Sequence, residues 1–179
     1  MTKDDEMFAP VLPSDEVMRF LAENPGANWE DSLMYFVDRY PQIEDTKVQW
    51  IVEGGAAVRL HNQTRRTPND IDIITRKSEV KDEFANAKGF DIKTVEDWFT
   101  LRGLDYTEEK GEILFSNVTT TELHGKQLLI LNPPALVVSK TISTHRFAPQ
   151  RPEDQADIDL LSANSQAVQS LIQSITARL

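Results

Sequence analysis

The chain has 179 residues, of which 40% are hydrophobic and 27% are charged, and its formal net charge at pH 7 is −10. This length suits one domain with its own core and is short for two, and the composition excludes a disordered chain. The absence of cysteine excludes disulfides, thiolate metal sites and a cysteine nucleophile. The acidic balance disfavours nonspecific binding to nucleic acid.

The N-terminal segment MTKDDEMFAPVLPSDEV has no apolar run of signal-peptide length, and no segment approaches the length of a membrane span. We therefore expect a soluble, cytoplasmic protein with no membrane contact. Residues 1–12 are predicted to form a flexible tail and residues 13–179 a single domain. Within it we expect N-terminal helices in 13–45, a catalytic sheet region in 46–132 and C-terminal helices in 133–179.

Two helices are predicted before the sheet. Ser14 is a good N-cap for a helix that runs to about Glu23, with acidic residues in its first turn. Asn28 can cap a second, amphipathic helix that stops at Pro41.

The next segments alternate between strand and helix patterns. KVQWIVE, residues 47–53, is typical of a strand, GAAVRLHN of a short helix that starts at Gly55, and DIDIIT of a second strand. Ser78 can cap a helix over 79–87, and residues 88–111 show no clear pattern.

Three more strands are predicted in EILFSNV, TTELH and QLLIL, with Gly125 turning the last two into a hairpin. After Pro133 and Pro134 the pattern is helical to the end of the chain. Helices at both ends and a small mixed β-sheet between them predict an α+β fold.

Asp70 and Asp72 lie two residues apart in a segment that otherwise looks like a buried strand. Side chains at this spacing point to the same face of a strand, where two unpaired carboxylates repel each other and are costly to bury. A divalent cation removes both problems, and Mg²⁺ prefers carboxylate oxygens together with phosphates and water. The alternative is an edge strand that exposes both aspartates to solvent.

The strand before them ends in Gly54-Gly55, followed by a helix. Glycine lets backbone N–H groups approach a phosphate closely, and a helix N-terminus favours negative charge at that point. A phosphate-binding turn next to metal-binding carboxylates predicts a protein that handles a nucleoside triphosphate. A tight turn with no ligand is the alternative.

Gly-Gly, a short helix and then Asp-x-Asp resembles the signature of the nucleotidyltransferase superfamily, whose small members share the DNA polymerase β-like catalytic fold. The resemblance covers roughly residues 47–162 and is strongest to lincosamide and aminoglycoside nucleotidyltransferases and to AbiEii-type toxins. It implies that Gly54 and Gly55 contact the triphosphate. It also implies that Asp70 and Asp72 are catalytic and coordinate Mg²⁺ or Mn²⁺.

Three other positions follow from the same resemblance. Arg66 matches a basic position of AbiEii-like sequences, which implies nucleotide binding. The family usually adds a third carboxylate on an adjacent strand, and the expected strand is GEILFSNV. There Leu114 takes the aligned position, so either Glu112 supplies the third catalytic carboxylate from one pleat away or that carboxylate is missing. Glu112 is equally compatible with an ordinary charge at a strand end.

The C-terminal part, LNPPALVVSKTIS followed by RPEDQADIDLL, resembles the Lys and then Arg-x-x-Asp-x-x-Asp pattern of the same proteins. By this resemblance, Lys140 and Asp157 are the predicted nucleotide-binding residues; the alternative for Lys140 is a surface lysine whose aliphatic stem packs on apolar side chains. Asp157 is preferred over Asp154 because it lies beyond the first helical turn, beside apolar positions. A carboxylate there needs a partner, which Lys140 or Arg151 can supply.

Three functions are compatible with these residues. The first, which we predict, is a metal-dependent transfer of a nucleoside monophosphate from a nucleoside triphosphate to a small molecule or RNA, as in resistance-type enzymes. The second is a toxin-type transferase that acts on RNA and has a protein antitoxin as its partner. The third is a catalytically impaired protein of this fold that binds nucleotide or a protein partner.

Overall fold

The computed structural model describes residues 11–147 and 151–177, with the side chains of 143–147 outside the description. Most of the predicted tail, residues 1–10, also lies outside it. The elements, in chain order, are α2 (Asp15–Glu23), α3 (Trp29–Arg39), β1 (Ile43–Glu44), β2 (Lys47–Val48), β3 (Trp50–Glu53), α4 (Gly54–His61), β4 (Ile71–Thr75), α5 (Ser78–Glu83), β5 (Phe90–Thr94), α6 (Val95–Leu101), α7 (Glu108–Ser116), β6 (Val118–Leu123), β7 (Lys126–Leu131), α8 (Pro133–Phe147), α9 (Pro152–Leu161) and α10 (Ser165–Thr176).

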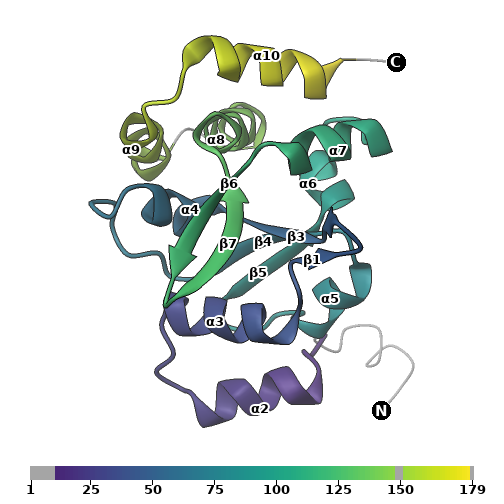
Figure 1. Cartoon of the computed structure of the whole chain (residues 1–179), viewed down its shortest axis with the longest axis vertical. Helices are drawn as coiled ribbons and strands as arrows, with labels where there is room; N and C mark the ends of the chain where they lie inside the picture. Colours follow the sequence, from purple (N-terminus) through teal and green to yellow (C-terminus); the bar gives the residue numbers. More distant parts are fainter. Residues whose placement is uncertain (1–10, 148–150, 178–179) are drawn as a thin grey trace.

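A five-stranded mixed sheet lies at the centre of the molecule, in the order β5-β4-β3-β7-β6 (Figure 1). Strand β3 runs antiparallel to β4 and parallel to β7, and β4 runs parallel to β5. All four residues of β3 are buried, as expected for a central strand covered on both faces. The predicted α+β fold with a small mixed sheet is confirmed.

Helices α2 and α3 lie on one side of the sheet, and α8, α9 and α10 lie on the other (Figure 1). The layer beneath α3 is aromatic, with the Phe36 ring edge-on to Trp50 at 4.8 Å and tilted against Phe84 at 5.2 Å. Such pairs add to the stabilisation that burial of the rings supplies. No helix in the described part of the chain is both long and apolar enough to cross a bilayer.

The local signals at the N-terminus work as predicted. The Ser14 side chain accepts a hydrogen bond from the Val17 N–H, and Asn28 forms a capping box with Asp31. Ser78, by contrast, is the first residue of α5 and not its cap. The Thr75 hydroxyl accepts the Lys77 N–H, which closes the strand-to-helix turn one residue earlier.

The hairpin at Gly125 is also confirmed. His124 and Gly125 both have positive φ, 51° and 76°, and the strand residues on either side of them are paired. Two central residues with positive φ match the twist of the flanking strands, and this combination favours glycine.

The predicted strand EILFSNV is wrong, because most of this segment belongs to helix α7. Thr107 caps the helix by accepting the Lys110 N–H, and two glutamates follow in the first turn. The buried residues Lys110, Gly111, Leu114 and Phe115 recur with helical and not with alternating spacing.

Candidate active site

A cavity of about 440 Å³ opens where β3 passes into α4 and where α8 and α9 face the sheet. Every residue that the sequence placed at the site, except Glu112, lines it. The described lining residues are Glu53, Gly54, Gly55, Arg65, Arg66, Pro68, Asn69, Asp70, Asp72, Asp91, Lys93, Arg102, Ser139, Lys140, Arg151, Asp154 and Asp157.

The sheet brings carboxylates from three adjacent strands together at this cavity. In the register of the strands, Asp72 on β4 is the Cα partner of Glu53 on β3 and of Asp91 on β5. Asp70 precedes β4 and also lines the cavity. The Asp-x-Asp spacing indicates Asp70 and Asp72 from the sequence, whereas Glu53 and Asp91 become their neighbours only through strand pairing.

Lys93 lies among these carboxylates. Its Nζ is 3.1 Å from Glu53 Oε1, 3.5 Å from Asp91 Oδ2 and 3.8 Å from Asp72 Oδ1, and its side chain is 14% exposed. Lys93 is not among the predicted site residues, because its segment shows no clear sequence pattern; once it is a strand, the two-residue spacing puts Asp91 and Lys93 on one face of β5.

The carboxylate centre carries more negative charge than its surroundings neutralise. Burial raises the pKa of Asp72 to about 8; Lys93 opposes this shift, and the charges of Glu53 and Asp91 add to it. Burial and the charge of Asp91 also raise the pKa of Asp70. Near pH 7 the centre therefore holds a proton or takes up a cation in its place.

The ammonium of Lys93 is fixed in its charged form. Burial alone would lower its pKa, but the carboxylates of Glu53, Asp72 and Asp91 outweigh burial and raise the pKa above the ordinary value for lysine.

The two glycines make room for side chains of the same site. Gly54 has a φ of +64°, and a Cβ there would lie 2.7 Å from Asp72 Cγ. A Cβ on Gly55 would lie 2.6 Å from Arg65 Nη2. Both distances are too short for real atoms, so a glycine pair is required for Asp72 and Arg65 to approach the N-terminus of α4. Contact of these glycines with a triphosphate stays a prediction.

A buried ionic network closes the opposite wall of the cavity. Arg65 donates to Asp157 through Nε at 2.9 Å and through Nη2 at 3.0 Å. Lys140 Nζ is 2.8 Å from Asp157 and 3.4 Å from Asp154. The predicted partnership of Lys140 with Asp157 is confirmed, whereas Arg151 contacts Asp154 instead.

Asp157 is 2% exposed, and Arg65 is 5% exposed. Burial would raise the pKa of Asp157, but the hydrogen bonds from Arg65 and Lys140 outweigh burial and lower the pKa below its ordinary value. The network joins the loop after α4 to helices α8 and α9, so it has a clear structural role. A role of Lys140 and Asp157 in nucleotide binding stays a prediction.

Two cationic side chains at the cavity have no carboxylate within ion-pair distance among the described residues, and these are Arg66 and Arg102. Arg102 is 8% exposed and stacks 4.1 Å over the ring of Trp98. It donates at 2.6 Å to the Ser139 hydroxyl and at 3.1 Å to the Trp98 carbonyl. These neutral acceptors orient the guanidinium, and the charges of Glu53 and Asp72 act on it from beyond ion-pair distance.

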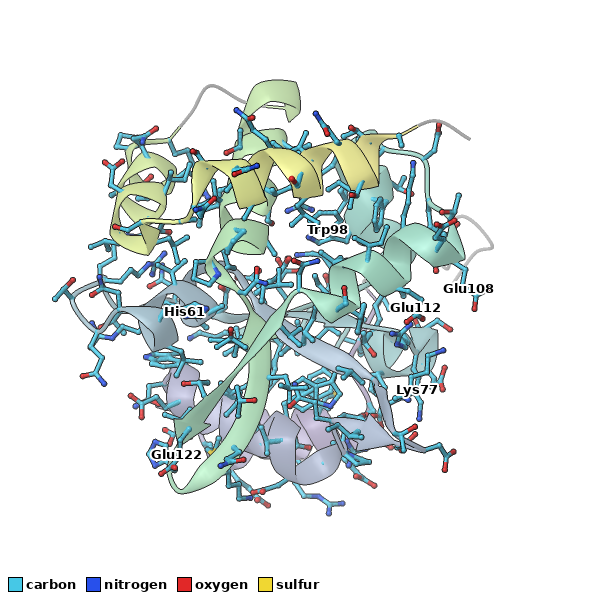
Figure 2. All side chains as sticks on the ribbon, turned by 45° about the horizontal axis from the view of Figure 1, so that its top comes forward. His61, Lys77, Trp98, Glu108, Glu112 and Glu122 are labelled. Atoms are coloured by element: carbon cyan, nitrogen blue, oxygen red, sulfur yellow. The ribbon has the colours of Figure 1, made fainter. Side chains whose placement is uncertain are left out.

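Glu112 does not belong to this cavity, which corrects the prediction. It lies on α7, on the side of the molecule that also carries Lys77 (Figure 2). Its half-exposed carboxylate accepts a hydrogen bond from Arg76 at 2.7 Å, and Lys47 lies 3.6 Å away. The carboxylates on the strands next to Asp72 are instead those of Glu53 and Asp91.

The carboxylate oxygens of Asp70 and Asp72 fit a divalent cation whose remaining ligands would come from a bound nucleotide and water. Among the described residues, no group of three or more His, Cys, Asp or Glu side chains forms a ready-made metal site. Mg²⁺ needs no such group, because one or two carboxylates plus phosphates and water are its usual ligands. Burial is the main cause of the raised pKa of Asp72, and the neighbouring charges of Glu53 and Asp91 add to it.

Comparison with known proteins adds one structural likeness. No protein-family model matches the chain, and no curated protein matches it in sequence. The solved structure of an antigenic nucleotidyltransferase-like protein from Paracoccidioides brasiliensis superimposes with a TM-score of 0.48 and 14% sequence identity. The match covers 92% of this chain and 90% of that chain. At this identity and TM-score, the likeness by itself assigns no function to the chain.

Proposed function

We propose that this chain is a metal-dependent nucleotidyltransferase, which moves a nucleoside monophosphate from a nucleoside triphosphate to an acceptor hydroxyl. The observation that carries the proposal is the division of one cavity into two parts. The carboxylate centre, Glu53, Asp70, Asp72 and Asp91, lies in one part, with the ammonium of Lys93 among its side chains. Arg66 and Arg102, which form no ion pair within the described part of the chain, line the same cavity.

The phosphates fit the cationic part of the cavity. The N-terminus of α4 begins at Gly54 and Gly55 in the cavity wall, and the side chain of its N-cap residue, Glu53, forms no capping hydrogen bond. Its backbone N–H groups and the positive end of the helix dipole favour an anion. We assign Arg66 and Arg102 to the phosphates as well, because both line the cavity and neither forms an ion pair with a carboxylate of the described residues.

Asp70 and Asp72 would hold Mg²⁺ or Mn²⁺. When bound, the ion polarises the α-phosphate and offsets the charge that develops on the leaving pyrophosphate. Asp91 is about half exposed at the cavity, unlike the more deeply buried Asp72. In our proposal Asp91 accepts the proton of the acceptor hydroxyl, whose oxygen attacks the α-phosphorus while pyrophosphate leaves.

We propose the acceptor only by its chemical class. The net charge of −10 attracts cationic small molecules and repels polyanions, so a small cationic alcohol suits the chain better than RNA.

The test has two stages. Calorimetry measures binding of nonhydrolysable analogues of the four triphosphates, with Mn²⁺, to the wild type and to the Asp70→Asn/Asp72→Asn protein. Glu112→Gln is the matched control, because it removes a carboxylate outside the cavity. We expect the wild type and the control to bind, and the double variant to lose at least tenfold in affinity.

The second stage measures transfer of labelled nucleotide to the small molecules and RNA of a cell extract. Labelled product that disappears with Asp72→Asn supports the enzyme. Binding without any product favours a catalytically impaired nucleotide-binding protein, and absence of both overturns the proposal.

A further inference from the structure

Lys93 occupies the place in the carboxylate centre where a cation is expected. Three carboxylates on three adjacent strands surround its Nζ at 3.1–3.8 Å, from Glu53, Asp91 and Asp72. Negative side chains repel one another when they are buried together, and a cation between them offsets that repulsion. A lysine ammonium does so with a single charge that cannot leave the site.

Glu53 holds the ammonium in position. Its side chain is 4% exposed, and its other carboxylate oxygen accepts a hydrogen bond from Trp98 Nε1 at 2.7 Å. Trp98 is fully buried and stacks under the guanidinium of Arg102. The Lys93–Glu53 pair is therefore unlike a mobile surface ion pair, because both of its ends are fixed by packing.

We propose that Lys93 is a tethered cation that fills one cation position of the centre, so that the site takes up a single divalent cation, at Asp70 and Asp72, with its nucleotide. The inference rests on the proposed function. The ammonium already balances part of the charge of Glu53, Asp72 and Asp91, and it repels a second metal ion from their oxygens.

A purely structural role for Lys93 is the competing explanation. In that case Lys93 only neutralises the buried Glu53, and its removal lowers stability without changing the number of metal ions. Counting ions separates the two explanations, because stability and stoichiometry are independent readouts.

The experiment counts Mn²⁺ ions per protein by the loss of the free-ion electron paramagnetic resonance signal, with nonhydrolysable analogues of the four triphosphates. We expect one ion for the wild type and two for Lys93→Met, in which the vacated space is lined by three carboxylates. Lys93→Arg keeps a cation there and should again bind one. The control is Lys81→Met, because Lys81 forms a partly exposed pair with Asp97 away from the cavity.

The ion counts test the role of Lys93 separately from the proposed function. Two ions on the wild type, or one ion on both the wild type and Lys93→Met, overturn the inference and leave the proposed function intact. No ion on either protein with any analogue overturns both. If Lys93→Met does not fold, Lys93→Gln replaces it, since a neutral side chain that can still donate a hydrogen bond to Glu53 keeps all three carboxylates, and the same counts apply.

Discussion

The Arg65–Asp157 pair offers the sharpest test of how the cavity is built. Asp157→Asn removes the negative charge but nearly keeps the shape of the side chain. It leaves Arg65, which is 5% exposed, without its ionic partner, while Lys140 keeps Asp154 at 3.4 Å. The predicted cost is therefore that of one uncompensated buried charge.

The magnitude follows from the burial of both groups. Breaking a buried ion pair by removing one partner costs about 3–5 kcal/mol. The lower end applies here, about 3 kcal/mol, because asparagine still accepts a hydrogen bond from the guanidinium. For a chain of this size we expect the melting temperature to fall by roughly 6–12 °C.

Urea unfolding at pH 7 measures the loss directly, and Asp159→Asn on the same helix is the control. The exposed carboxylate of Asp159 accepts a hydrogen bond from Gln155 at 2.9 Å and is part of no buried ion pair among the described residues, so the cost should stay below about 0.5 kcal/mol. Because the pKa of Asp157 is lowered in the folded state, its contribution is present above the ordinary value of 3.8 and is lost as the pH falls further. A cost below about 1 kcal/mol at pH 7 would refute the reasoning.

Three further predictions follow from the site. Gly54→Ala should lower the free energy of unfolding by about 1–3 kcal/mol, because Gly54 has a φ of +64° and an added Cβ would meet Asp72. Gly26→Ala is the control and should lose little, since no atom lies within 4 Å of a Cβ there; equal urea midpoints for the two variants would contradict the prediction. Without divalent cations, the stability of the wild type should fall as the pH rises from 5 to 8, because the folded state keeps a proton on Asp72 up to about pH 8 and the unfolded chain releases it near 3.8. Thermal melts of Asp72→Asn over the same pH range should lack this fall. Asp91→Asn should slow nucleotide transfer by a factor of about 10²–10⁴ and Glu112→Gln should not, so similar rates for both variants would remove Asp91 from the mechanism.

The elements that the sequence predicted correctly are those decided by nearby residues. Ser14 and Asn28 cap their helices, and Gly125 turns its hairpin, through contacts that span four residues or fewer. Such signals need no knowledge of the rest of the chain.

The segment around Leu114 was mistaken for a strand because a short apolar run fits a buried strand and a buried helix equally well. The deciding signal lay upstream, where Thr107 precedes two glutamates. A similar signal at Thr94, which forms a capping box with Asp97, marks the end of β5 and the start of α6. Recognising it would have placed Asp91 and Lys93 on a strand.

The composition of the carboxylate centre could not be predicted from local patterns. Glu53, Asp72 and Asp91 are separated by up to 38 positions in the chain, and only the antiparallel β3–β4 and parallel β4–β5 pairings align them. A shift of one residue in either pairing would turn one of these carboxylates to the opposite face of the sheet. The centre is thus a property of strand register and not of the Asp-x-Asp motif alone.

The glycine pair connects the two halves of the cavity. Gly54 leaves space for Asp72 of the carboxylate centre, and Gly55 leaves space for Arg65 of the network with Asp157. A side chain at either position would displace one wall of the cavity from the N-terminus of α4. The same backbone freedom that suits a phosphate-binding turn is therefore needed by the protein before any ligand is bound. For this reason a glycine variant that loses nucleotide affinity is informative only together with its stability, whereas Arg66 and Arg102 can be tested with no steric conflict at α4.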